Sequence, residues 1–134
     1  MTDYGDIVDN TVFDQLLEMD DDEDRDFSKG IAKDYMTQAE TTLQEMDESL
    51  AKKDLESMGR LGHFMKGSSA ALGLRKIRET CENIQNYGRK VDSGGKPLTL
   101  TNDELVKKLD ELVKDAKEQY KEAKAWLNKF YKME

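Results

Sequence analysis

Cysteine, proline and histidine each occur once in this chain of 134 residues. A single cysteine excludes an internal disulfide. No apolar run reaches the roughly 18 residues that a membrane span needs, and no basic-then-apolar leader is recognisable. One proline, 37% charged residues and no regular alternation of polar with apolar residues favour helices over strands. We therefore expect one all-α domain inside the cell, without a membrane segment.

The single histidine, His63, narrows the chemistry that the chain can perform. We expect no metal site, because there is no second histidine and Cys81 stands alone. The Ser68-Ser69 pair lacks the glycine-flanked turn of a hydrolytic nucleophile, and neither a nucleotide-binding loop nor kinase motifs occur. Nucleophilic chemistry by an imidazole remains. The simpler alternative is an ordinary histidine on a helix.

Charge is unevenly distributed along the chain. The net charge of −8 argues against binding nucleic acid. Residues 1–26 carry eleven acids against one base, whereas residues 57–90 carry seven bases against two acids. The segment that contains His63 is therefore basic within an acidic protein, which would suit a partner with an acidic pocket. Either charged run could also be an ordinary solvated surface.

Apolar residues at helical spacing predict five helices. After a polar tail of residues 1–10, Thr11 is expected to cap a short helix. Longer helices are expected over about 27–52, 54–72 and 74–90, with Gly73 ending the third. A last helix, roughly 45 Å long, should begin at Thr101 or Asn102. Residues 11–134 would then form one up-down four-helix bundle, with the short N-terminal helix across one end.

The apolar stripes of three of these helices identify the expected core. The stripe of the last helix could alternatively bind a partner as a coiled coil. The predicted core residues are Phe27, Ile31, Tyr35, Ala39, Leu43, Met46 and Leu50, then Ile77, Cys81, Ile84 and Gly88, then Leu105, Leu109, Leu112, Ala116, Tyr120, Ala123, Leu127 and Phe130.

His63 should lie opposite the apolar face of its helix. Leu61 and Met65 fall on the far side, while small residues and two cations fall within about a turn or two of the imidazole. Each glycine inside a helix reduces helix stability by about 1 kcal/mol relative to alanine, so the presence of three glycines in this helix calls for an explanation. Close approach of another surface to His63 is the explanation that we predict. The residues near His63 are Gly59, Arg60, Gly62, Lys66, Gly67 and Ala70.

The run from His63 to Leu74, His-Phe-Met-Lys-Gly-Ser-Ser-Ala-Ala-Leu-Gly-Leu, resembles the phosphorylation-site helix of histidine-containing phosphotransfer (HPt) domains. That pattern is His, any residue, apolar, Lys, Gly, then Ser or Ala. With the segment Cys-Glu-Asn-Ile-Gln-Asn at 81–86, the chain is most similar to the free-standing phosphorelay proteins of fungi. The resemblance covers residues 58–90 closely and the rest in helix layout.

The resemblance implies a phosphotransfer intermediate. His63 would accept a phosphoryl group from a receiver-domain aspartyl-phosphate and pass it to an aspartate of a response regulator. Lys66 would compensate charge on the phosphoryl oxygens, and Gly67 would leave room for them. Gln85, Arg89 and Arg60 would support the site, although each could be only a surface residue. The receiver-docking candidates, which could equally be core residues, are Val12, Phe13, Leu16 and Leu17 of the first helix, with Gly59 and Ala70.

The same resemblance implies partners and surroundings. The partners would be receiver domains of a hybrid sensor histidine kinase and of response regulators. The chain would be a monomer in cytoplasm and nucleus, in osmotic stress signalling, without ATP-dependent kinase activity. No cofactor would be bound, and Mg²⁺ would sit on the receiver. Two other classes stay open: a helical adaptor that is never phosphorylated, and an unrelated helical interaction domain that uses the last helix.

Overall fold

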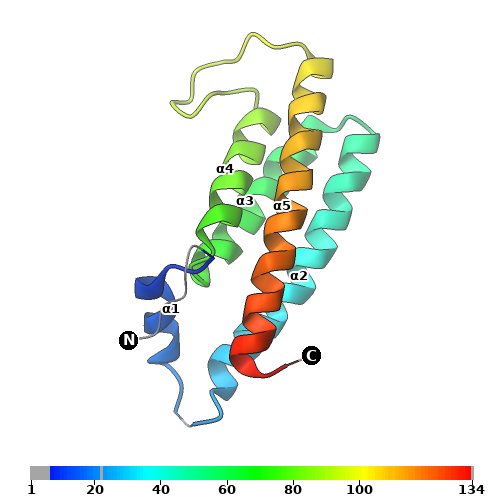
Figure 1. Cartoon of the computed structure of the whole chain (residues 1–134). Coiled ribbons are helices and arrows are strands. Elements are labelled where there is room, and N and C mark those ends of the chain that lie inside the picture. The colour runs from blue at the N-terminus through cyan, green and yellow to red at the C-terminus, as the bar shows by residue number, and fades with distance from the viewer. Residues whose placement is uncertain (1–6, 22, 134) are drawn as a thin grey trace.

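The computed structural model describes residues 7–21 and 23–133, and this part of the chain contains five α-helices (Figure 1). Helices α2 to α5 form an up-down bundle in which α3 and α5 each pack against α2 and α4. Therefore α3 and α5 are diagonal to one another. The predicted four-helix bundle is confirmed. The helices are α1 (Asn10–Leu17), α2 (Asp26–Ala51), α3 (Leu55–Ala71), α4 (Arg75–Gly88) and α5 (Asn102–Tyr131).

Short polar side chains fix where three of the helices begin. Asp54 caps α3 by accepting a hydrogen bond from the Ser57 backbone N–H at 3.1 Å. Thr101 and Glu104 form a reciprocal capping box at the start of α5, which satisfies backbone donors that have no partner inside the helix. Helix α1 is capped by Asp9, which accepts from the Thr11 N–H at 3.0 Å. Thr101 caps α5, as predicted. The prediction that Thr11 caps α1 is wrong, because Asp9 holds that position.

Helix α1 lies beside the end of the bundle where α2 begins and α5 ends (Figure 1). Its start is tied to the turn between α3 and α4, because the Asp9 N–H donates to the Gly73 carbonyl at 2.7 Å. Gly73 adopts a φ of 73° there, a conformation that glycine takes without strain. Val8 is buried. Residues 7–10 therefore do not belong to a polar tail, and residues 1–6 lie outside the described part of the chain.

An aromatic cluster holds α1 against the end of α5. The Phe13 ring is fully buried and meets the rings of Trp126 and Phe130 edge to face, at centroid distances of 5.2 and 5.1 Å. Such pairs contribute about 0.5–1.5 kcal/mol beyond the area that they bury. The guanidinium of Arg25 lies 4.8 Å from the centre of the Phe130 ring. Phe27 at the start of α2 is half exposed and is not part of this cluster, so its predicted place in the core is wrong.

The predicted stripe of α4 is buried in full, and that of α5 is buried along most of its length. Because the α5 stripe lies inside the bundle, it is not free to form a coiled coil with a partner. Cys81 lies in the core of α4, where burial raises the pKa of its thiol to about 12. It is therefore a protonated, inert core residue. No helix within 7–21 or 23–133 combines the length and the apolar character needed to cross a membrane.

Helices α3 and α4 touch through glycines. A Cβ added to Gly62 would lie 2.7 Å from the Gln85 backbone nitrogen and 2.9 Å from the Cys81 carbonyl oxygen. A Cβ added to Gly88 would lie 2.7 Å from the Gly59 Cα and 2.9 Å from the Leu55 carbonyl oxygen. Contacts this short with backbone atoms cannot be relieved by a side-chain rotation. Only glycine at these positions allows the observed separation of the two helices.

Replacing Gly62 by alanine should therefore destabilise the protein, although alanine is the better helix former. Overpacking of this kind costs about 1–3 kcal/mol. The control is Gly30→Ala in α2, where an added Cβ meets nothing within 4 Å, and which should stabilise the fold by about 0.5–1 kcal/mol. Urea unfolding of both variants checks the opposite signs. A Gly62→Ala protein as stable as wild type would contradict the close contact.

Candidate functional site

His63 lies at the surface in the middle of α3. Met58 and Met65 on the same helix are fully buried, so the core side of α3 faces away from the imidazole. The helix is held from behind by a buried hydrogen bond of 2.9 Å between the hydroxyls of Tyr35 and Ser69. Burial raises the pKa of Tyr35 well above its usual value, so the pair stays neutral. The histidine thus sits on a rigid element but is open to a partner.

The surface beyond His63 is open on its C-terminal side. Lys66 is half-buried one turn further along α3, and Gly67 is exposed. A Cβ at Gly67 would meet no atom within 4 Å. Ala70, two turns from His63, is half-buried. These residues leave space next to the imidazole and place one cation beside that space.

Contrary to the sequence prediction, Gly59 and Gly62 do not clear space around His63 but allow α3 and α4 to pack closely. Both are buried against α4, so they set the distance between helices rather than clear a path to His63. The role of Gly59 in receiver docking stays a prediction. The helical wheel placed Gly59 on the histidine face, but it could not reveal that α4 covers that edge of the helix.

Of the two α4 residues predicted to flank His63, Gln85 is buried and Arg89 is exposed. The prediction that Gln85 might be a surface residue is wrong. Its Oε1 atom has no hydrogen-bond partner in the described part of the chain, a state that costs about 1–3 kcal/mol. The Cγ of Arg89 would lie 3.3 Å from a Cβ on Gly59, so the stem of the arginine lies against α3. The roles of both residues toward His63 stay predictions.

The docking candidates in α1 divide into two groups. Phe13 and Leu16 are buried, so for these two residues the alternative of core packing holds. Val12 and Leu17 keep partial exposure. Sequence reasoning missed three large apolar side chains that the structure exposes, namely Phe64 (50%), Phe27 (50%) and Met19 (61%). Phe64 directly follows His63, and its position on the helical wheel, about 100° from His63, was the available signal.

Within residues 7–21 and 23–133 no group of three or more His, Cys, Asp or Glu side chains could hold a metal ion. Ser68 donates to the Met65 carbonyl at 3.2 Å, and Ser69 is buried. Neither serine is placed as an exposed nucleophile. His63 is therefore the group at this face that can react with an incoming phosphoryl group.

Comparison with known proteins agrees with this geometry. Residues 30–123, more than half of the chain, match the model of the Hpt domain. The chain therefore belongs to the Hpt domain family.

Two curated relatives illustrate the similarity. Multistep phosphorelay regulator 1 of Schizosaccharomyces pombe is 57% identical over 82 residues, which cover 61% of this chain and 28% of the relative. Phosphorelay intermediate protein YPD1 of Saccharomyces cerevisiae is 48% identical over 89 residues, which cover 66% of this chain and 53% of the relative. The matched part thus spans about half or less of the length of these relatives.

Solved structures resemble the whole bundle. A crystal structure of the yeast phosphorelay protein YPD1 has a TM-score of 0.82 and 30% identity, covering 95% of this chain and 96% of that chain. A co-crystal structure of Saccharomyces cerevisiae Ypd1 with the receiver domain of its downstream response regulator Ssk1 has a TM-score of 0.83 and 33% identity. It covers 95% of each chain.

The open space at Gly67 leads to a prediction. Gly67→Gln should leave the fold at least as stable, because glutamine is the better helix former by several tenths of a kcal/mol and the added Cβ meets nothing. The longer side chain should obstruct the space next to His63 and slow phosphoryl transfer. Unfolding curves and transfer rates measured on one preparation separate the two effects. Unimpaired transfer would show that the space is not used.

Proposed function

We propose that this chain is a phosphorelay intermediate. His63 accepts a phosphoryl group from the aspartyl-phosphate of one receiver domain and passes it to the aspartate of another. The observation that carries the proposal is an exposed imidazole on a rigid helix, with Lys66 one turn away and open space at Gly67. Membership of the Hpt domain family and the names of the relatives support it.

The reaction is a displacement at phosphorus. The lone pair of an imidazole nitrogen attacks the phosphorus in line, the P–N bond forms, and the bond from phosphorus to the aspartyl oxygen breaks to release a carboxylate. Transfer to the next receiver runs the same steps in reverse. Phosphoryl transfer depends mainly on positioning and on compensation of charge. Helix α3 would supply the position, and Lys66 would supply a positive charge beside the transferred oxygens.

The partners proposed are receiver domains of a hybrid sensor kinase and of response regulators. The complex of Ypd1 with the Ssk1 receiver domain supports the second of these. The exposed ring of Phe64 beside His63 offers an apolar contact that a docking domain could cover. Mg²⁺ would be held by the receiver. Cytoplasmic and nuclear location, a monomeric state and a link to osmotic stress stay predictions.

His63→Gln should fold normally, since surface substitutions usually change stability by no more than about ±0.5 kcal/mol, yet it should accept no phosphoryl group. The experiment is incubation with a radiolabelled phospho-receiver, followed by acid and by alkali. Label on the wild type should be lost in acid and kept in base, as expected for phosphohistidine. Label retained by the variant would refute the mechanism. Receiver binding without any transferred label would instead indicate an adaptor.

Lys66→Ala should slow transfer in both directions without abolishing it. A charge about 4 Å from a phosphoryl oxygen contributes roughly 1 kcal/mol in water and about 4 kcal/mol at an effective dielectric near 20. Docking excludes water from the site and lowers the local dielectric constant. Loss of the Lys66 charge should therefore affect the transfer rate more than the lifetime of free phosphohistidine. We expect rates lower by about one to two orders of magnitude, or about 1.4–2.8 kcal/mol. Rapid-quench assays measure this, and unchanged rates would remove Lys66 from the mechanism.

A further inference from the structure

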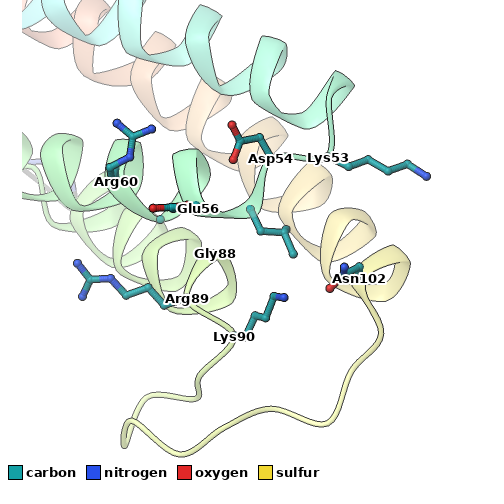
Figure 2. A pocket seen from close by; sticks show the side chains of 10 residues that line it. Lys53, Asp54, Glu56, Arg60, Gly88, Arg89, Lys90 and Asn102 are labelled. Atoms are coloured by element: carbon teal, nitrogen blue, oxygen red, sulfur yellow. The ribbon is translucent and has the colours of Figure 1, made fainter.

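A pocket of about 620 Å³ opens one helical turn from His63, between the start of α3, the end of α4 and the start of α5 (Figure 2). Arg60, three residues before His63, forms part of its wall. A partner domain seated on His63 would therefore cover at least this end of the pocket. We call it the basic pocket, because its charged lining residues are the bases Lys53, Arg60, Arg89 and Lys90 and the acids Asp54 and Glu56.

Three of the four cations that line the pocket are in no ion pair within the described residues. At the far end, Lys53 is paired with Asp103 at 3.2 Å. Arg60 donates only to the Ser57 hydroxyl, at 2.8 Å, and the side chains of Arg89 and Lys90 have no ion pair or hydrogen bond in residues 7–21 and 23–133. The chain has 29 acids. Although acids are abundant, Arg89 and Lys90 are in no ion pair, and Arg60 is linked to Asp54 only through the Ser57 hydroxyl.

Arg60 is held in position by hydrogen bonds that begin at the cap of α3. The Asp54 carboxylate accepts from the Ser57 hydroxyl at 2.7 Å and from the Ser57 N–H at 3.1 Å. The Ser57 hydroxyl oxygen accepts in turn from Arg60. The bonds from Ser57 lower the pKa of Asp54, so this anchor stays ionised. A guanidinium that is already ordered loses less conformational freedom when it binds a carboxylate.

Arg89 reaches the same wall from the other helix. Because Gly59 has no side chain, the Arg89 stem can lie against α3, as the 3.3 Å distance to a Cβ built on Gly59 indicates. Figure 2 shows the side chains of Arg60 and Arg89 at one end of the pocket, with Lys53 and Asn102 at the other. Like charges brought together by the helix contact repel each other, and a bound anion would offset that repulsion.

The walls of the pocket favour one kind of anion. Leu55 is the only apolar side chain among the lining residues, and none is aromatic, so there is no surface on which a nucleobase could stack. Four bases against two acids leave a balance of +2, enough to attract carboxylates. Arg60 in the pocket wall lies one helical turn before His63 on α3, so a partner seated on His63 would reach this end of the pocket. Charge complementarity at such a position sets encounter rate and orientation.

We propose that the basic pocket is a docking subsite for an acidic surface segment of the receiver domain, in which Arg60 and Lys90 bind carboxylates and the Asp54–Ser57 pair positions Arg60. The proposal rests on the proposed function of His63. Arg89 lines the pocket but is left out of the test, because it is also predicted to support His63. The subsite acts on binding and orientation, and the transfer step itself stays with His63 and Lys66.

The test uses the Ssk1 receiver domain as probe and the double variant Arg60→Gln/Lys90→Gln. Its control, Lys108→Gln/Lys121→Gln, removes the same charge from exposed positions on α5, diagonal to α3. At about 50 mM salt the pocket variant should raise Kd about tenfold, and the control less than about twofold. The difference should shrink at about 0.5 M salt, where the Debye length is about 4 Å. Transfer at saturating receiver should fall less than binding does, because the subsite acts on binding and orientation.

Two further measurements separate the outcomes. Ser57→Ala keeps the charge but frees Arg60, so it should raise Kd about threefold in wild type and not at all in the Arg60→Gln background. Wild-type binding by the pocket variant with transfer intact would overturn the subsite while leaving the proposed function standing. Failure of wild type to take up phosphoryl groups would overturn both. Release of the receiver by inorganic phosphate at constant ionic strength, from wild type but not from the pocket variant, would overturn the acidic segment in favour of a small-anion site.

Discussion

Where Gly62 meets α4, an added methyl group would stand within 2.9 Å of two backbone atoms, and this contact governs the arrangement of the site. Helices packed through larger side chains are usually 8–10 Å apart, and glycines allow a closer approach. The close contact fixes the rotation of α3 about its axis. His63 is thereby directed outward, while Gln85 of α4 and Arg89, which directly follows α4, lie against Gly59 of α3. The glycines that reduce the helix propensity of α3 are thus required by its packing.

The second constraint is rigidity behind the histidine. Ser69 bonds to Tyr35 of α2, while Met58, Met65 and Cys81 fill the space between the helices. A nucleophile that must meet a partner's phosphorus in line gains from a fixed position, because the partner then has to search only its own orientation. The open surface at Gly67 completes this design, in which the chain provides a fixed imidazole and a partner would supply the enclosing walls.

Sequence periodicity was enough to locate the helices and the turn at Gly73, because burial of one stripe per helix dominates a bundle. It failed where tertiary contacts decide. Phe27 matches the stripe of α2 but is half exposed, whereas Phe13 of α1, outside that stripe, is fully buried against rings of α5. The same cluster explains why Phe13 is buried instead of exposed for docking. Glycines carry the least information of all, since Gly59, Gly62 and Gly67 look alike in the sequence and only Gly67 faces open space.

Lysines and arginines are used differently in this fold. Each of the four ion pairs in residues 7–21 and 23–133 uses a lysine, two of them joining α5 to α2. Arg60 belongs to α3, Arg75 and Arg78 belong to α4, and Arg89 directly follows α4; none of the four is in such a pair. Exposed ion pairs contribute at most about 1 kcal/mol each to stability, so pairing these arginines would have added little stability.

An arginine offers a planar set of donors that matches a carboxylate or a phosphate better than a lysine does. In a chain with a net charge of −8, residues 57–90 carry seven bases against two acids, so the α3–α4 hairpin that bears His63 has a local charge opposite to that of the whole molecule. An acidic partner is then attracted to this face and repelled by the rest of the surface.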